Sequence, residues 1–161
     1  MRWATGLIVG RFCPPHLGHS YLISRAASQV DSLVVFVNTR RNEPIPGVLR
    51  AQWLRELHRD VEVVEVRHDL ETNFDDPDLW ERWLHLFMVH WPLEDGPHAL
   101  FSSEGYGDEL ARRLGATAVS VDPERSVVPV SATMIREQPL EHLDRLAPNV
   151  RDWIEQWAAN R

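Results

Sequence analysis

Short runs of apolar and β-branched residues alternate along the chain with segments in which apolar residues recur every three or four positions. The runs are typical of buried parallel strands, and the longer steps are typical of amphipathic helices. The runs predict strands at residues 5–10, 32–37, 61–66, 98–102 and 116–121. The segments between them predict helices at residues 17–30, 47–58, 78–90 and 107–115.

This alternation of strand and helix predicts the fold class. Strands that are each followed by a helix form a mostly parallel sheet, with right-handed crossovers and helices on both faces. We therefore expect an α/β, Rossmann-like, doubly wound fold with a five-stranded sheet. Ligands of such folds bind at the carboxyl ends of the strands. The loops at 39–47 and 68–78, which are rich in Asn, Pro and Asp, are expected to carry part of the site.

The end of the chain predicts one more helix. Val150, Trp153, Ile154 and Trp157 follow the spacing of one helix face, and Pro148 suits a first helical turn. No repeat or low-complexity tract divides the chain, so we expect a single domain over residues 1–161. No apolar segment approaches the roughly 20 residues of a membrane span, and the N-terminus does not resemble a signal peptide. We therefore expect a cytoplasmic protein with no membrane partner.

The composition of the chain excludes several partners and catalytic mechanisms. The 161 residues carry a formal net charge of −7, which argues against a nucleic-acid partner. All 17 cationic side chains are arginines, so a Walker-A phosphate loop, a kinase-type lysine and a lysine Schiff base are excluded. The single cysteine, Cys13, cannot form an internal disulfide.

The first candidate site is the stretch GLIVGRFCPPHLGH at residues 6–19. Its two prolines enforce an extended path after the first strand, so His16 and His19 flank the N-terminus of the following helix. Free backbone N–H groups and the helix dipole favour an anion there, and Arg11 and the two imidazoles add directed donors. Gly18 is expected to leave room for a ligand close to the backbone.

Other interpretations of this stretch are open. The two histidines could be surface residues on a turn. They could also supply two zinc ligands, although the spacing identifies no third ligand and we predict no metal site formed by the protein. Cys13 could be a nucleophile, but a lone cysteine is more often a small buried filler.

A second candidate site is VSATMIR at residues 130–136. Ser131 and Thr133 are expected to open a short helix that Pro139 ends, so their hydroxyls and the free N–H groups would face an anion. Arg136 adds a fixed cation. The alternative is an ordinary helix cap beside a solvated arginine.

Together these stretches resemble the two signatures of a nucleotidyltransferase superfamily, H-x-G-H at a helix start and I-S-x-T-x-x-R near the C-terminus. Over nearly the whole chain, the sequence is most similar to the nicotinamide-nucleotide adenylyltransferases of the archaeal type and of the bifunctional bacterial regulator type. The start V-S-A departs from the commoner I-S-G but keeps the hydroxyl and arginine positions.

The resemblance implies roles for individual residues. The catalytic residues would be His16, His19, Arg11 and Arg136. The ATP-binding residues would be Gly10, Arg11, Phe12, His16, His19, Ser103, Tyr106, Ser131, Thr133 and Arg136. The acceptor-binding residues would be Asn38, Arg50 and Trp80, with Arg50 on substrate phosphate and Trp80 stacked on nicotinamide. The helical spacing also allows Trp80 to be core, and we expect Trp83 and Phe87 to be core.

The implied reaction joins nicotinamide mononucleotide to ATP, giving NAD and pyrophosphate without a covalent enzyme intermediate. Mg²⁺ would be bound mainly through the ATP phosphates. Another acceptor, such as nicotinate mononucleotide or phosphopantetheine, remains open, as does a nucleotide sensor without turnover. The sequence also leaves open whether the chain forms a homo-oligomer.

Overall fold

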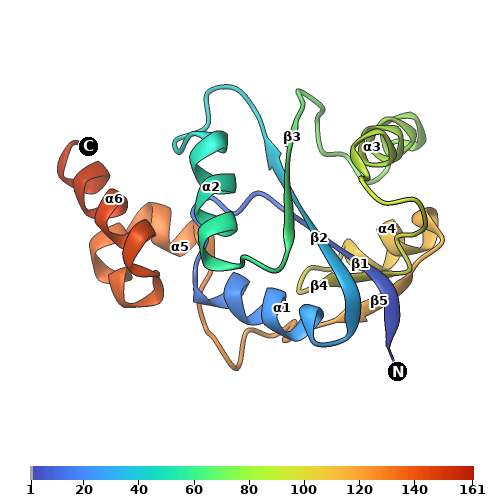
Figure 1. Ribbon diagram of the computed structural model, residues 1–161. Helices are drawn as coiled ribbons and strands as arrows, with labels where there is room; N and C mark the ends of the chain where they lie inside the picture. Colours follow the sequence, from blue (N-terminus) through green and yellow to red (C-terminus); the bar gives the residue numbers. More distant parts are fainter. Residues whose placement is uncertain (1) are drawn as a thin grey trace.

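The computed structural model describes residues 2–161 (Figure 1). Its strands are β1 (Trp3–Gly10), β2 (Val30–Thr39), β3 (Glu62–Arg67), β4 (Ala99–Ser102) and β5 (Thr117–Ser120). Its α-helices are α1 (Leu17–Ala27), α2 (Gly47–Leu57), α3 (Pro77–His90), α4 (Gly107–Leu114), α5 (Ala132–Glu137) and α6 (Pro148–Ala159). Every predicted strand and helix is confirmed, with shifts of a few residues at the ends.

All strand pairs are parallel, and the strand order is β3-β2-β1-β4-β5. The chain builds the sheet outward from β1 to β3 and then returns to the other side of β1 to add β4 and β5. The loops that follow β1 and β4 consequently leave the sheet toward opposite faces and open a crevice between them. The predicted doubly wound fold is confirmed, and its switch point lies at the carboxyl end of β1.

Successive residues of β1 point to opposite faces of the sheet and enter different cores. Ile8 belongs to the core cluster that includes residues of α1 and α2, such as Leu54, whereas Leu7 belongs to the cluster that includes Phe87 of α3 and Leu110 of α4. Figure 1 shows these helix pairs on the two sides of the sheet. Both faces of the central strands are therefore buried, which explains why the sequences of these strands are unbroken apolar runs.

The C-terminal segment forms a third cluster outside the sheet. Short 3₁₀ turns at Pro139–Glu141 and Leu143–Arg145 link α5 to α6. Helix α5 ends at Glu137, shortly before Pro139, and Pro139 is the first residue of the next turn. The predicted terminal helix is confirmed, and α6 lies against α2, where the rings of Trp153 and Trp53 meet edge to face at 5.7 Å. The α5–α6 segment thereby holds the second motif beside the start of α1 (Figure 1).

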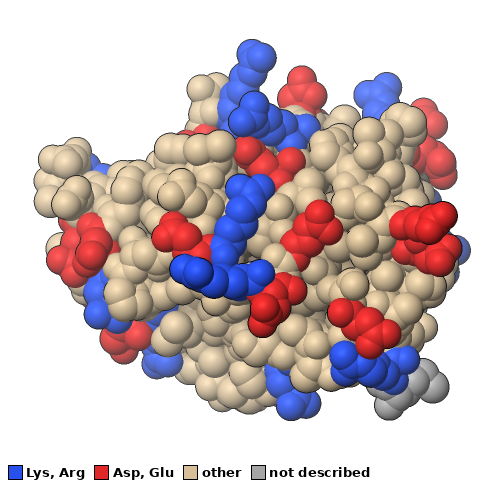
Figure 2. All heavy atoms as spheres, viewed as in Figure 1, with Lys and Arg blue, Asp and Glu red and all other residues tan. Residues whose placement is uncertain are grey.

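Within residues 2–161, no helix combines the length and the apolar character that crossing a membrane requires. Arginine and acidic side chains are interspersed on the face drawn in Figure 2.

Candidate functional site

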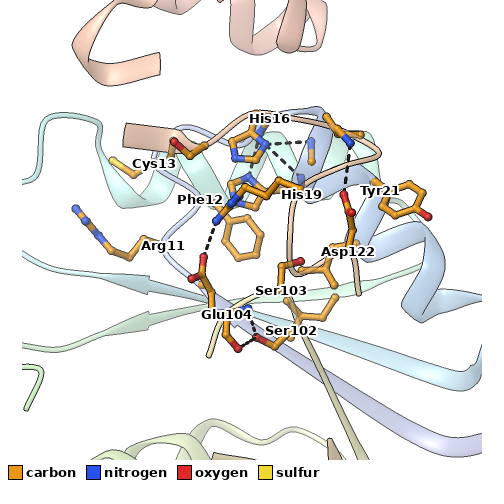
Figure 3. A pocket seen from close by; sticks show the side chains of 18 of the residues that line it. Arg11, Phe12, Cys13, His16, His19, Tyr21, Ser102, Ser103, Glu104 and Asp122 are labelled. Carbon is orange, nitrogen blue, oxygen red and sulfur yellow. Dashed lines mark hydrogen bonds and ion pairs between the residues drawn. The ribbon is translucent and has the colours of Figure 1, made fainter. Parts of the chain in front are cut away.

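Two adjoining cavities open at the carboxyl end of β1. The first, of about 290 Å³, is lined by residues of both predicted motifs together with the loops after β4 and β5 (Figure 3). The second, of about 200 Å³, is lined largely by aromatic and aliphatic side chains from α3, α4 and the loop before α3. Val9, Gly10, Arg11 and Tyr106 line both cavities. The site therefore offers a polar chamber and an apolar chamber that meet at the end of the central strand.

His16 and His19 lie at the start of α1 in the wall of the first cavity. His16 is the N-cap of the helix, and its Nδ1 accepts the N–H groups of Gly18 at 3.0 Å and His19 at 3.4 Å. The Nδ1 of His19 in turn accepts the N–H of His16 at 3.1 Å. Each neutral ring therefore carries its proton on Nε2. The Nε2 of His16 is buried and has no hydrogen-bond partner, so it is a donor left to be satisfied.

The surroundings of these histidines keep them uncharged. Burial, together with the nearby Arg125 guanidinium, lowers the pKa of His16 to about 3. Burial, His16 and Arg125 together hold the pKa of His19 well below its usual range. In the protein without a ligand, both rings are therefore neutral hydrogen-bond donors, and the positive charge of the site comes from its arginines.

The turn before α1 is packed around these rings. A Cβ on Gly18 would lie 2.8 Å from Cε1 of His16, so the space that this glycine leaves is filled by the imidazole. Gly18 also lines the first cavity, so the absence of its Cβ first serves the packing of His16, and the approach of a ligand to its backbone stays a prediction. Phe12 has a left-handed backbone, with φ of 51°, and its ring meets His19 edge to face at 4.6 Å. Gly10 lies next to this ring, and a Cβ there would lie only 3.0 Å from it, a tight contact.

The second motif lies against the first. Ser131 is the N-cap of α5 and its Oγ accepts the Met134 N–H at 3.2 Å, whereas Thr133 lies inside the first turn and does not open the helix. Arg136 donates to the hydroxyl of Thr133 at 3.3 Å and to the backbone oxygen of Cys13 at 2.6 Å. Ser131, Thr133 and Arg136 all line the first cavity, and their binding to ATP stays a prediction.

Ser103 and Tyr106, which follow β4, both line the first cavity, and Tyr106 also lines the second. The Ser103 hydroxyl donates to the backbone oxygen of Val121 at 2.6 Å, and the Tyr106 hydroxyl donates to that of Val9 at 2.9 Å. Burial and the neighbouring Glu104 raise the pKa of Tyr106 to about 12. The Tyr106 side chain is therefore uncharged and held in one position, where it lines both cavities.

Arg11 lies at the junction of the two cavities. Its Nε and Nη2 donate to Glu43 at 3.1 and 3.0 Å, yet its side chain is still 54% exposed. Burial alone would raise the pKa of Glu43, but the backbone N–H of Arg40, the Arg50 guanidinium and Arg11 outweigh it and lower this pKa. Arg11 is thus held at the site as a charged, accessible donor.

The prediction that Arg50 binds substrate phosphate is wrong. Its side chain is 0% exposed and lines neither cavity. The guanidinium donates to the backbone oxygens of Ile45 at 3.1 Å and Arg11 at 2.6 Å, and it forms an ion pair with Glu43. A buried guanidinium is stable only when its N–H groups are hydrogen-bonded within the protein. Through these bonds Arg50 holds the backbone of Arg11 in place.

The second cavity contains Asn38 and the tryptophans of α3. Asn38 lines it, and its Oδ1 is buried without a hydrogen-bond partner. Trp80 is only 7% exposed, its indole N–H donates to the backbone oxygen of Phe74 at 3.0 Å, and the Arg113 guanidinium lies 4.7 Å from its ring. Trp83, expected in the core, is partly buried and lines the cavity. The expectation that Trp83 is a core residue is therefore wrong, whereas Phe87 is buried as expected. Trp80 also lines the cavity, and its contact with the acceptor stays a prediction.

Arg125 and Asp122 line the first cavity but lie outside both sequence motifs. Arg125 donates through Nη1 to the backbone oxygen of Val130 at 3.0 Å and through Nη2 to Glu104 at 2.8 Å. Asp122 accepts from the N–H and hydroxyl of Ser126 and so holds the loop in shape. A cation shortly before the second motif was the available signal, but a surface loop explains it equally well.

Two alternatives for the first stretch were a Cys13 nucleophile and a zinc site at the histidines. Cys13 is fully buried, as a filler would be, although its backbone oxygen binds Arg136. Among residues 2–161, no group of three histidine, cysteine or acidic side chains is arranged to hold a metal ion. The carboxylates of the first cavity, Glu104 and Asp122, are engaged by Arg125 and Ser126.

A parallel sheet with this switch point, and a histidine-capped helix beside it, define a protein of the nucleotidyltransferase type. A family profile described as cytidylyltransferase-like matches residues 7–138, and the chain belongs to this family. The resemblance drawn from the two motifs is confirmed.

The chain is also similar to two curated bacterial proteins, both named trifunctional NAD biosynthesis/regulator protein NadR. It is 28% identical to that of Escherichia coli K12 and 26% identical to that of Salmonella typhimurium LT2. Each alignment covers 92% of this chain and 40% of the relative, so the chain spans about two fifths of their length.

Solved structures agree with this assignment. A NadR protein crystallised with NAD and AMP-PNP is 26% identical, with a TM-score of 0.65 over 89% of this chain and 45% of that one. A bifunctional NMN adenylyltransferase/ADP ribose pyrophosphatase from Francisella tularensis has a TM-score of 0.69 over 96% of this chain and 49% of its own, at 13% identity. The second likeness shows the shared fold.

Proposed function

We propose that this chain transfers the adenylyl group of ATP to nicotinamide mononucleotide, forming NAD and pyrophosphate. The observation that carries the proposal is the buried Nε2–H of His16, which has no protein partner and belongs to a residue in the wall of an arginine-lined cavity. Such a donor is satisfied by an anionic oxygen. The similarity to NadR proteins, one of them crystallised with NAD and AMP-PNP, supports the choice of reaction.

In this reaction an oxygen of the acceptor's 5′-phosphate attacks the α-phosphorus of ATP in line. The new P–O bond forms as the bond between the α-phosphorus and the oxygen bridging to the β-phosphate breaks, and that electron pair leaves with pyrophosphate. The acceptor oxygen is already ionised, so no base and no protein nucleophile are required. The protein contributes by positioning the two phosphates and by stabilising charge on the nonbridging and leaving oxygens.

The first cavity has the groups for that task. The Nε2–H donors of His16 and His19 are fixed by the backbone bonds to Nδ1, so they need no reorganisation when charge develops. Arg136 is held in place by Cys13 and Thr133, and its planar guanidinium suits phosphate oxygens. Arg11, which lines both cavities, lies where the phosphates of the two substrates would meet.

The second cavity would take the base of the acceptor. The pyridinium of nicotinamide is a flat cation, and an indole face stabilises such a cation by about 1–2 kcal/mol when water is excluded. Trp83 is the better candidate for that contact, because Arg113 already lies over the ring of Trp80.

Mg²⁺ would enter with the nucleotide. Glu104 and Asp122 already have partners within the chain, so the triphosphate and water would supply most of the ligands of the ion. When bound, the ion would neutralise charge on the phosphate oxygens.

The test is a transfer assay with purified protein and MgATP. Nicotinamide mononucleotide, nicotinate mononucleotide and phosphopantetheine are offered separately, and both dinucleotide and pyrophosphate are quantified. We expect NAD and pyrophosphate in equal amounts with the first acceptor. Faster turnover of another acceptor would show that the assigned acceptor is wrong. Binding of MgATP without pyrophosphate release from any acceptor would favour a nucleotide sensor.

A further inference from the structure

We propose that Arg125 is an additional ligand of the nucleotide's polyphosphate and that Glu104 occupies Arg125 until the nucleotide displaces it. This inference rests on the proposed function, because it concerns the triphosphate that the first cavity would bind. It assigns a role to a pair of residues that lie outside both motifs.

The pair joins two loops across the first cavity. Glu104 follows β4, whereas Arg125 lies between β5 and α5, and both line the cavity. Arg125 Nη2 donates to Glu104 Oε1 at 2.8 Å. Figure 3 shows the Glu104 side chain reaching across the cavity toward the side that carries His16 and His19. A carboxylate of the protein therefore stands among the groups that we expect to bind phosphate.

The backbone fixes Arg125 in position. Asp122 accepts the N–H groups of Ser126 at 2.9 Å and Val127 at 3.1 Å, which folds the loop around it. Arg125 itself has a left-handed backbone, with φ of 53°, a conformation uncommon for arginine and frequent at functional sites. Its Nη1 donates to the backbone oxygen of Val130 at 3.0 Å, so the guanidinium is anchored on one edge beside the second motif.

The other edge is held by a partner that is easily exchanged. The side chains of Arg125 and Glu104 are 36% and 53% exposed, and ion pairs of such exposure are weak. A polyphosphate carries more negative charge than a carboxylate and offers several oxygens, so it can replace Glu104 as the partner of the guanidinium. The positive charge of Arg125 already reaches both motif histidines, since it lowers the pKa of each. The guanidinium is therefore placed to act on the same phosphates as His16 and His19.

The binding experiment measures the affinity of the full chain for MgATP and for inorganic pyrophosphate by calorimetry. Arg125→Ala should weaken both by about tenfold or more, as loss of a charge-assisted hydrogen bond implies. Glu104→Gln, which keeps the shape but removes the charge, should tighten both by about threefold to tenfold. Glu109→Gln is the matched control, because Glu109 pairs with Arg112 and Arg113 on α4 and lines neither cavity. It should change neither affinity.

A crystal structure with AMP-PNP or pyrophosphate supplies the direct test. We expect a guanidinium nitrogen of Arg125 within hydrogen-bond distance of a phosphate oxygen and the Glu104 carboxylate more than about 4 Å away. An intact Arg125–Glu104 pair beside bound phosphate would overturn the inference, as would unchanged affinities in both variants. The proposed function fails separately: phosphate binding with the expected response of both variants, but no product from any acceptor, would overturn the reaction and keep the role of the pair.

Discussion

The imidazole rings of His16 and His19 stack with their centroids 3.7 Å apart and 22° between their planes. Two charged rings at this distance would repel each other, so the stack requires neutral rings. The reciprocal bonds from Nδ1 to the backbone N–H groups account for it, because they leave both protons on Nε2. The same contacts that cap α1 therefore also set the direction of two donors in the site.

The two roles of His16 can be separated. Asparagine is a good N-cap but is too short to replace Nε2, so His16→Asn should keep the free energy of unfolding within about 0.5 kcal/mol and lower kcat/KM by about 10²-fold. His16→Ala should lose the same activity and also about 1 kcal/mol of stability. Urea unfolding and steady-state kinetics measure both quantities. The control is His85→Asn, on the exposed face of α3. Full activity of His16→Asn would mean that the histidine only caps the helix.

The lowered pKa of His16 predicts how stability depends on pH. Unfolded histidine binds a proton below pH 6.5, whereas folded His16 binds one only near pH 3. The free energy of unfolding should therefore fall by up to about 1.4 kcal/mol per pH unit below pH 6.5 on account of His16. Above pH 6.5 the titration of His16 should add no pH dependence. Urea unfolding from pH 8 to 4.5, without nucleotide, measures this slope. His16→Asn removes the titrating group, so parallel curves for the variant and the wild type would contradict the prediction.

Arg50 should matter for stability rather than for binding. Arg50→Met leaves the carboxylate of Glu43 with one fewer partner and should lower the free energy of unfolding by about 3–5 kcal/mol. Arg50→Lys keeps the charge without the fork and should have an intermediate effect. Arg112→Met, at an exposed ion pair, should stay within about 0.5 kcal/mol. A stable Arg50→Met protein whose KM is raised for either substrate would return Arg50 to the phosphate site.

The tryptophans of α3 should separate in the opposite way. Trp83→Leu should raise KM for nicotinamide mononucleotide about tenfold more than KM for ATP, with little change in melting temperature. Trp80→Leu should instead lower stability by several kcal/mol, because its ring is buried and lies beneath the Arg113 guanidinium. Both Michaelis constants and thermal unfolding are measured on each variant. A selective effect of Trp80→Leu on the acceptor, in a stable protein, would place the stacking contact on Trp80.

The periodicity of the sequence determined the order and type of the main elements. Buried parallel strands must be apolar on both sides, and helices on a sheet must repeat their apolar residues every three or four positions, so both leave a pattern along the chain. The two motifs were also readable, because a strand end, two prolines and a following helix place His16 and His19 at a helix start by local geometry alone.

Tertiary packing decided how deep each side chain lies and what it meets. Arg50 and Arg136 are both arginines on predicted helices, yet Arg50 is covered by the loop before α2 and Arg136 faces the cavity. Trp80 and Trp83 differ because Arg113, from another helix, lies over one ring. Arg125 joins the site only because its loop folds back from β5 onto Glu104, a residue 21 positions earlier. Contacts between distant segments leave no period in the sequence, so only the folded chain assigns these side chains to core, wall or site.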